Sequence, residues 1–347
     1  MSNSENSQTP IGNFGKFGLL DHLTRNVSIK NKGTVKGIGD DSAVIDTSGE
    51  LSLVSTDLLL EGIHFNLIYT PLRHLGYKTV IRAISDIYAM NGVPGQILIG
   101  LGLSSKFSVE KVTELYEGIL LACRKYNVDL AGGDITSSLT GLTLSVTATG
   151  TVEREKLVNR DGAGPNDLIC VTGNFGAAFM GLQILERERK LFSRDSGFKP
   201  DFAGFEYIIE RQLKPEFPAN VVRHLKEADI RPTAMIDVSD GLASDIIHVC
   251  RLSGTGCRIW YEKIPIDLET SKAAEEFQMD PATPALNGGE DFELLFTVPV
   301  DYADKIRDIP GVSLIGHMTN ADLGYKLINE EGSEITLKAQ GWEMSEG

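Results

Sequence analysis

Aspartates recur beside glycine or hydroxyl residues at several separate points of this 347-residue chain. The first is Gly37-Ile38-Gly39-Asp40-Asp41, in which two glycines permit a tight turn and two adjacent carboxylates follow. Two carboxylates about 4 Å apart in a half-buried site repel each other by roughly 4 kcal/mol at an effective dielectric near 20. A divalent cation reverses that sign, whereas a surface turn, the alternative explanation, gains nothing from the repulsion.

The same pattern returns at the ends of predicted strands and within one helix. An alternating segment predicts a strand over Leu51–Asp57 that ends in Ser55-Thr56-Asp57, and Ser85-Asp86 lies in a helical pattern over Leu75–Met90. A second strand runs into Gly132-Gly133-Asp134, and a third finishes in Asp237-Val238-Ser239-Asp240. Taken singly, each is explained by a turn or a cap, but their recurrence favours a shared site because burying an unpaired carboxylate is costly.

The candidate ligands are all hard oxygen donors, which suit Mg²⁺ and disfavour zinc. They are Asp40, Asp41, Thr56, Asp57, Asp86, Asp134, Asp237 and Asp240. The four cysteines form no C-x-x-C, and there is neither a P-loop nor a protein-kinase motif set. Phosphoryl transfer would therefore depend on metal ions and backbone amides, without a P-loop lysine.

The elements that would position these residues alternate between strand and helix but include consecutive strands. This order predicts an α/β or α+β fold with a mixed sheet. We expect a disordered tail over residues 1–12, an N-terminal domain over 13–153 and a C-terminal α/β domain over 154–347. The strand and helix around Gly173 and Gly176 lack G-x-G-x-x-G spacing and predict a packing turn. The charged segment 187–217 predicts a solvated helical excursion.

Composition limits the partners of the chain. The net charge of −15 disfavours non-specific binding to nucleic acid or to an anionic membrane surface, although bound cations can invert the local field for an anionic substrate. No apolar run approaches the roughly 20 residues that span a bilayer. Scattered cysteines and a polar N-terminus without signal-peptide character favour the cytoplasm.

Six ordered motifs carry a family resemblance from about Phe14 to Trp342. They are Gly37–Asp41, Ser55–Asp57 with Glu61–Phe65, Ser85–Met90, Gly132–Asp134, Asp237–Leu242 and Gly288–Leu294. Together they resemble thiamine-monophosphate kinases of the aminoimidazole-ribonucleotide-synthetase-like (PurM-like) superfamily. The chain departs from the commonest pattern of that family at Tyr88 and at Asn91-Gly92.

The resemblance implies a two-domain fold, with a homodimer formed through the N-terminal sheet and with ATP and thiamine monophosphate between the domains. It implies direct transfer of the γ-phosphoryl group of ATP to a phosphate acceptor with several Mg²⁺ ions. The metal-positioning residues would be Asp57, Asp86 and Asp134, within the ligand set given above. ATP contacts would fall on Tyr116, Gly133, Asp134, Arg160 and Ser239, and contacts to the thiamine phosphate on His64, Glu290 and Trp342.

Two other functions compete with this one. The chain is also compatible with another ATP-dependent synthetase or cyclo-ligase of the superfamily, such as aminoimidazole ribonucleotide synthetase or the hydrogenase-maturation dehydratase. The third interpretation is a non-catalytic sensor that binds Mg-ATP. The segment Glu61–Phe65 and Trp342 favour the thiamine enzyme over the synthetase or cyclo-ligase. The full carboxylate set disfavours the non-catalytic sensor.

Overall fold

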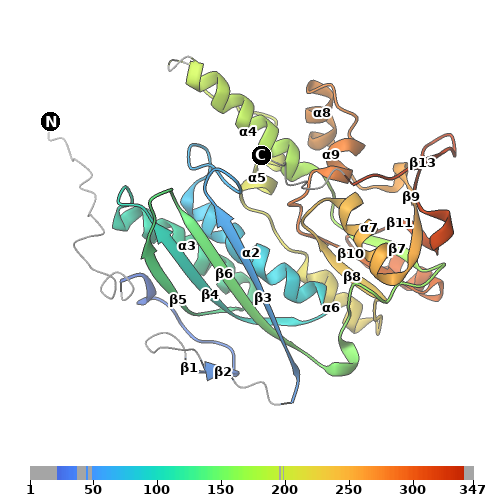
Figure 1. Cartoon of the computed structure of the whole chain (residues 1–347), viewed down its shortest axis with the longest axis horizontal. Helices are drawn as coiled ribbons and strands as arrows, with labels where there is room; N and C mark the ends of the chain where they lie inside the picture. Colours follow the sequence, from blue (N-terminus) through green and yellow to red (C-terminus); the bar gives the residue numbers. More distant parts are fainter. Residues whose placement is uncertain (1–21, 37–43, 46–48, 195–196, 198, 340–347) are drawn as a thin grey trace. The chain divides into compact units, whose positions relative to one another are not determined.

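The computed structural model of the chain describes residues 22–36, 44–45, 49–194, 197 and 199–339. These residues form a mixed α/β fold with two large sheets, as the alternating segments predict (Figure 1). The chain divides into two compact units. The first holds the described residues up to Ile87 together with Val93–Val152, and the second holds Tyr88–Gly92 and the described residues from Glu153 onward.

The first unit is built on a four-stranded sheet in the order β3-β6-β4-β5. Its strands β4 and β5 are parallel, and the other neighbours are antiparallel. The strands are β3 (Leu51–Leu60), β4 (Val93–Leu103), β5 (Asp129–Ser137) and β6 (Thr143–Val152), and a separate pair is formed by β1 (Thr34–Lys36) and β2 (Val44–Ile45). The outer strands of the large sheet are therefore β3 and β5.

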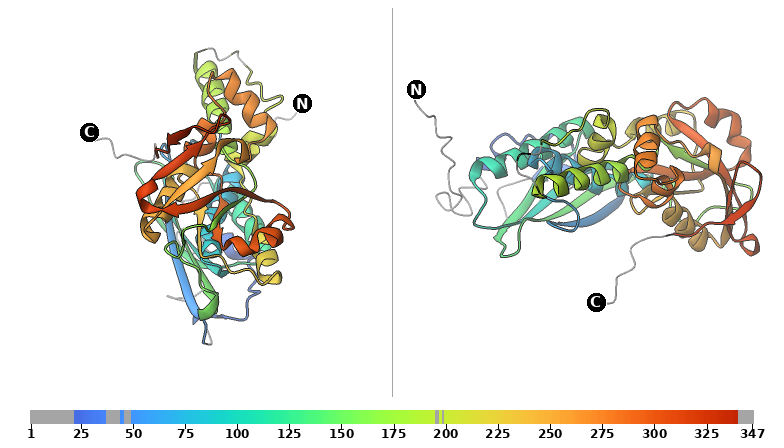
Figure 2. Two further views of the ribbon diagram at one scale, coloured as in Figure 1. Left: turned by 90° about the vertical axis from the view of Figure 1, so that its right-hand side faces the viewer. Right: turned by 90° about the horizontal axis from the view of Figure 1, so that it is seen from above.

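One face of this sheet is covered by helices α2 (Leu72–Ala89) and α3 (Val109–Tyr126), as Figure 2 shows in the view from above. Along β3 the side chains alternate, so Leu53 and Leu59 are buried on the helical side. Val54 and Leu58 belong to the opposite face and are 69% and 51% exposed. An apolar open face of this kind is a candidate contact surface.

Helices α2 and α3 cross at two glycines. A Cβ on Gly76 would lie 2.0 Å from the carbonyl oxygen of Leu115, and a Cβ on Gly118 would lie 1.8 Å from that of Arg73. Both distances are far shorter than any van der Waals contact, so only glycine permits this approach. The crossing fixes α2, and with it Asp86, against the neighbouring helix.

The second unit contains a seven-stranded sheet in the order β13-β12-β9-β11-β7-β10-β8. Its strands are β7 (Leu168–Thr172), β8 (Ala234–Val238), β9 (Thr255–Trp260), β10 (Glu293–Val298), β11 (Val312–Asn320), β12 (Tyr325–Ile328) and β13 (Glu334–Thr336). Its helices are α4 (Ala177–Arg194), α5 (Glu206–Leu213), α6 (Ala219–Glu227), α7 (Leu242–Ser253), α8 (Leu268–Glu276), α9 (Ala282–Asn287) and α10 (Ala303–Arg307). Short 3₁₀ turns cover Arg154–Lys156, Tyr261–Lys263, Val300–Tyr302 and Ala321–Leu323.

Two expectations about these elements were wrong. The strand expected to end at Asp57 continues to Leu60, because Leu58–Leu60 pair with Thr143–Ser145 of β6. Asp57 therefore lies inside β3. Asp134 likewise lies inside its strand, because β5 continues to Ser137. The segment 187–217 is not wholly solvated, since Ile208 and Phe217 are buried.

The atypical residues after Asp86 have local structural roles. Tyr88 stacks on Phe217 with ring centroids 4.8 Å apart and an interplanar angle of 9°. Asn91 adopts a left-handed φ of 59°, which asparagine tolerates better than most residues, and its side-chain amide donates to the carbonyl of Lys156 at 2.8 Å. These residues thus stabilise the second unit.

Candidate active site

Asp57 and Asp86 form a carboxylate pair in the first unit. Asp57 lies on β3 and Asp86 on α2, and the hydroxyl of Ser55 donates a short hydrogen bond to Oδ2 of Asp86. Burial raises the pKa of Asp57, and the negative charge of Asp86 raises it further. Oδ2 of Asp57 is buried and accepts no hydrogen bond from the part of the chain that the structure describes. An orphaned buried carboxylate oxygen beside a second carboxylate suits a hard cation.

Arg82 partly compensates this negative charge. Its Nε donates to Oδ1 of Asp57 at 2.8 Å, and this interaction lowers the pKa of Asp57 against the larger effect of burial. Sequence reasoning missed Arg82, although it stands four residues before Asp86 on the same helix, where side chains are neighbours. That spacing was the available signal.

The neighbouring predicted residues differ in their placement. Thr56 alternates to the open face of the sheet, where its hydroxyl donates to the carbonyl of Val146 at 3.1 Å. The structure therefore does not bring this hydroxyl together with Asp57 and Asp86. Half-buried His64 accepts the Leu60 N–H at Nδ1, at 3.0 Å, so the neutral imidazole carries its proton on Nε2.

Gly133 and Asp134 lie on β5, at the edge of the sheet opposite to β3. Asp57 on β3 lies in register with one residue on each following strand: Val146 on β6, Ile99 on β4 and Gly133 on β5. Three strand spacings, about 14 Å in total, therefore separate the β3 edge from the β5 edge. Asp134 is exposed, and its row across the sheet includes Gly100, Ser145 and Leu58 of the open face. Within one chain the sheet thus keeps Asp134 away from Asp57.

Two further details concern the predicted ATP contacts of this unit. A Cβ on Gly133 would lie 1.9 Å from the carbonyl oxygen of Ile99, so only glycine fits there. Tyr116 is buried within α3, and burial raises the pKa of its hydroxyl to about 12. The side chain is 4% exposed and so presents little surface to a ligand.

The second unit gathers several predicted residues around the start of α7. Arg160, Ser239 and Asp240 line one cavity of about 330 Å³, together with Asp245, His248 and Arg251. Asp237 is buried on β8, three residues before Asp240. Sequence reasoning brought the first three residues to one site, and the three helix residues were missed.

The carboxyl of Asp245 is buried beside two other acidic residues. Burial, together with the charges of Asp240 and Asp237, raises its pKa to about 8. Its carboxyl accepts the backbone N–H of Asp240 at 3.3 Å and so helps to hold the turn that precedes α7. The cavity therefore combines two acidic groups, Asp240 and Asp245, with the basic side chains of Arg160 and Arg251.

Glu290 is joined to this turn by the backbone. Its N–H donates to the carbonyl of Ser239 at 2.8 Å, and that of Phe292 donates to Val238 at 3.0 Å. Both residues adopt a left-handed φ, 57° for Glu290 and 51° for Phe292, which is uncommon outside glycine. Backbone strain of this kind is typical of functional sites.

Between those two residues, Asp291 begins a buried ionic cluster that also contains Glu293 and Arg211. Arg211 donates to Oε1 of Glu293 and to the carbonyl of Asp291, both at 2.9 Å. Asp291 accepts the Gly176 N–H at 3.0 Å, and burial raises its pKa to about 7. This cluster fixes the loop that carries Glu290.

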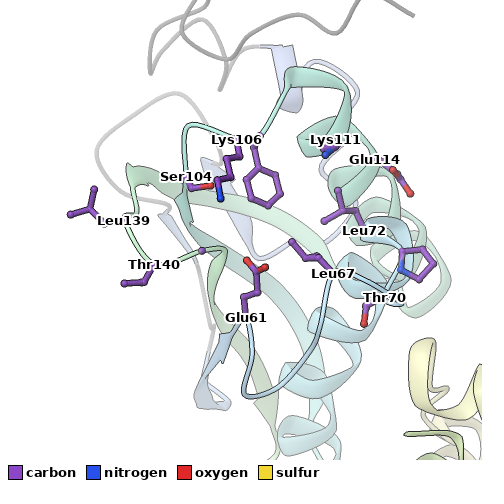
Figure 3. A pocket seen from close by; sticks show the side chains of 13 residues that line it. Glu61, Leu67, Thr70, Leu72, Ser104, Lys106, Lys111, Glu114, Leu139 and Thr140 are labelled. Carbon is purple, nitrogen blue, oxygen red and sulfur yellow. The ribbon is translucent and has the colours of Figure 1, made fainter. Parts of the chain in front are cut away.

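Another cavity, of about 630 Å³, lies in the first unit at the end of β3 (Figure 3). Glu61 lines it and accepts the Leu142 N–H at 2.7 Å. Two lysines, Lys106 and Lys111, and two glutamates, Glu61 and Glu114, line this cavity. Their charges balance, so the cavity favours neither an anionic nor a cationic ligand.

No group of three or more His, Cys, Asp or Glu side chains within the described ranges is arranged to hold a metal ion. Asp40, Asp41 and Trp342 lie outside the described residues. The donor chemistry and the orphaned oxygen of Asp57 nevertheless fit a magnesium ligand. No helix in the described ranges combines the length and apolar character that crossing a membrane requires.

Comparisons with known proteins define the class first. Residues 39–152 match the family model of the AIR synthase related protein, N-terminal domain. The computed fold is also similar to a hydrogenase maturation protein HypE solved in complex with ATP, with a TM-score of 0.73 over 93% of this chain and 95% of the other, at 17% identity. At that identity the likeness establishes the PurM-like fold alone.

Closer relatives define the family. The chain is 33% identical to the thiamine-monophosphate kinase of Aquifex aeolicus over 87% of its own length and 91% of the relative, and 34% identical to that of Bacillus subtilis over 94% and 98%. A solved structure of AaThiL complexed with AMPPCP and TMP covers 96% of this chain and 98% of its own, with a TM-score of 0.73 and 30% identity. The chain belongs to the thiamine-monophosphate kinase family of enzymes.

Proposed function

We propose that this chain transfers the γ-phosphoryl group of ATP to thiamine monophosphate, with direct in-line geometry and with several Mg²⁺ ions. The relatives named thiamine-monophosphate kinase support the reaction, and the solved relative that carries AMPPCP and TMP supports both substrates. Within the chain, the observation that carries the proposal is the Asp57–Asp86 pair with its orphaned oxygen.

Asp57 and Asp86 would hold metal ions, and Asp40, Asp41, Asp134, Asp237 and Asp240 remain proposed ligands. The hydroxyl of Thr56 faces the open side of the sheet and would not join the Asp57–Asp86 pair. When bound, Mg²⁺ would neutralise phosphate charge and so reduce the repulsion between two polyanions. The acceptor phosphate has a second pKa of about 6, so it needs little deprotonation and the chain need not supply a strong base. The reaction therefore needs no paired nucleophile and base in the protein.

The remaining residues would orient the substrates. Arg160 and Ser239, which line one cavity, would bind nucleotide phosphates through a charge-assisted hydrogen bond and a hydroxyl. His64 would donate from Nε2 to the acceptor phosphate. Glu290 would attract the cationic thiazolium, and Trp342 would stack on it. Gly133 and Tyr116 remain proposed ATP contacts.

The homodimer is part of the proposal because one chain separates Asp57 from Asp134. These residues occupy opposite edges of the sheet, so a second copy laid on the open face would bring the β5 edge of one chain to the β3 edge of the other. The exposed Val54 and Leu58 would then be covered. Each site would lie at a β3 edge, between Asp57 on the helical side of that strand and Asp134 on the open face of the partner.

The reaction is tested by ADP release from ATP with thiamine monophosphate, compared with a panel of other phosphates. We expect release only with thiamine monophosphate, with stoichiometric thiamine diphosphate as the product. ATP binding without turnover would support the sensor instead. Turnover with an amidine-forming or carbamoyl substrate, and none with thiamine monophosphate, would support the synthetase alternative.

The shared site is tested by mixing two inactive variants, Asp57→Ala and Asp134→Ala. A mixed dimer has one site with both aspartates intact, so random exchange should restore about a quarter of wild-type activity. No recovery after verified subunit exchange would contradict the shared site. A fully active monomer in sedimentation at micromolar concentration would contradict the dimer itself.

A further inference from the structure

Two arginines of the second unit, Arg160 and Arg251, line the same cavity of about 330 Å³ beside α7. Both are exposed, and within the part of the chain that the structure describes neither guanidinium donates a hydrogen bond or forms an ion pair. The chain holds 48 acidic residues, so two arginines in one cavity without a carboxylate partner are unusual here. A guanidinium in this situation is available to an anion from outside the chain.

Hydrogen bonds to the backbone bring the two arginines together. The hydroxyl of Ser253, at the end of α7, donates to the carbonyl of Arg160 at 3.4 Å and accepts the N–H of Ala163 at 3.2 Å. Arg251 lies in the last turn of the same helix, two residues before Ser253. The loop that carries Arg160 is thus tied to the end of α7 that carries Arg251, and both arginines belong to one end of the cavity.

The other end of the cavity is acidic. Asp240 precedes α7, and Asp245 lies in its first turn, where its carboxyl accepts the N–H of Asp240 at 3.3 Å. Asp245 and Arg251 are two turns apart on the helix, which corresponds to about 9 Å along its axis. Carboxylates suit a hard cation and guanidiniums suit an anion, so a polyphosphate with its bound metal ion matches both ends.

The rest of the lining offers little to a flat ring. Ile236 and Ile247 are 3% and 6% exposed, and among the described lining residues there is no aromatic side chain on which a base could stack. The volume is also at the lower end of the roughly 300–1,000 Å³ that small-molecule sites occupy. The cavity therefore fits the phosphate groups of a nucleotide better than its base.

We propose that Arg251 is a nucleotide-binding residue that forms, with Arg160, a two-arginine clamp on the phosphate groups of Mg-bound ATP. Each guanidinium presents parallel N–H donors that match phosphate oxygens and stays charged at every physiological pH. Asp240 and Asp245 lie at the end of the cavity that suits the metal ion. This inference deepens the proposed function and rests on ATP as its substrate.

The test measures binding of AMPPCP with Mg²⁺ to the full-length protein by isothermal titration calorimetry, without thiamine monophosphate. We expect Arg251→Gln to bind at least about tenfold more weakly than wild type, because a hydrogen bond between charged groups is lost. Arg251→Lys keeps the charge without the planar fork and should fall between the two. Arg223→Gln, which removes an exposed arginine from α6 of the same unit, is the matched control and should stay within about twofold of wild type.

Inorganic tripolyphosphate with Mg²⁺ then separates the phosphate groups from the nucleoside. A loss of affinity in Arg251→Gln similar to the loss with AMPPCP would support the clamp. A loss confined to AMPPCP, or no binding of tripolyphosphate to wild type, would overturn the assignment to phosphate. Arg251→Met repeats both titrations if the glutamine variant fails to fold.

Turnover gives a further readout. The KM for ATP of Arg251→Gln should rise by about the same factor as the loss of AMPPCP affinity, with a much smaller change in kcat. A lowered kcat with an unchanged KM for ATP would contradict a binding role. Wild-type protein that does not bind AMPPCP would contradict the proposed function, whereas equal AMPPCP affinities of wild type and Arg251→Gln would overturn this inference alone.

Discussion

Two clusters in this chain are built from the same parts, one arginine and two acidic residues. In the first unit, Arg82 pairs with Asp57 beside Asp86. In the second, Arg211 pairs with Glu293 beside Asp291. The side chains of Arg211 and Glu293 are 11% and 6% exposed, against 21% and 17% for Arg82 and Asp57.

The difference lies in what surrounds the charges. Glu293 also accepts the hydroxyl of Thr172 at 2.6 Å, and Asp291 accepts a backbone N–H at the start of α4, so several elements fix that cluster. The printed contacts of the first cluster come from one strand and one helix, and its groups are more exposed. Among the described residues each cluster keeps a buried carboxylate oxygen without a hydrogen bond, Oδ2 of Asp57 and Oδ1 of Asp291, so the difference lies in exposure and in the number of donors. Similar composition thus serves structure where several elements enclose the charges, and is open to ligands where the charges are partly exposed.

The largest effect expected from this comparison is on catalysis. Asp57→Ala or Asp86→Ala should lower kcat by about 10³-fold or more, since each removes a ligand of the proposed metal site. Stability without metal should hold or rise for Asp86→Ala, because one of two repelling carboxylates is gone. Asp57→Ala also breaks the ion pair with Arg82, so this variant should lose some stability. Turnover assays and thermal melts in EDTA measure these effects. An Asp86→Ala variant that melts well below wild type in EDTA would make that residue structural.

Breaking the second cluster should instead cost stability. Arg211→Met leaves two acidic groups buried without their cation, and such a loss costs about 3–5 kcal/mol. Urea unfolding of the metal-free protein measures it. Arg223→Met is the control, because Arg223 pairs with Glu227 at 3.7 Å with both side chains more than 60% exposed, and should cost less than about 1 kcal/mol. Equal losses in the two variants would remove the distinction.

The second cluster should also set a pH dependence. The pKa of Asp291 is raised to about 7 in the folded protein, so the folded state keeps a proton that the unfolded chain releases near pH 4. Stability from this group is therefore present at low pH and is lost as the pH rises toward 7. Asp291→Asn should remove a slope of about 1.4 kcal/mol per pH unit between about pH 5 and 7. Parallel stability curves for variant and wild type would refute this.

The smallest effects compare two hydroxyls. Thr172→Val removes a buried donor to Glu293 and should cost about 1.5–3 kcal/mol, as hydrogen bonds to charged groups do. Ser55→Ala removes the donor to Asp86 in the more open cluster and should cost less than about 1 kcal/mol, with its main effect on kcat. Denaturant midpoints and turnover measured on both variants decide the comparison. A larger stability loss for Ser55→Ala would reverse it.

Sequence reasoning found the elements whose periodicity is local. The helix predicted over Leu75–Met90 corresponds to α2, Leu72–Ala89, because side-chain spacing within the segment defines it. The end of β3 could not be found this way, since pairing with β6 decides how far it runs. Its length matters for the site because it places Asp57 within the sheet.

The site was less accessible to sequence than the fold. Carboxylates beside glycines and hydroxyls predict Asp57, Asp86 and Asp240 as site residues, whereas Arg82 offered only its spacing of four residues to Asp86, because an arginine on a helix is usually solvated. Asp245 is acidic and lies one turn into α7, yet only the folded chain reveals its burial. Charges that act through burial are set by tertiary structure and are not readable from residue order.

The glycine crossing of α2 and α3 has a consequence for how this chain can diverge. Every substitution of Gly76 or Gly118 adds at least one carbon, which would lie 2.0 Å or less from a carbonyl oxygen. No other amino acid therefore fits at either position. Compensation elsewhere would have to separate the two helices, and that would shift Arg82 and Asp86 together. Descendants of this sequence can therefore vary the exposed faces of the pair freely while inheriting the crossing unchanged.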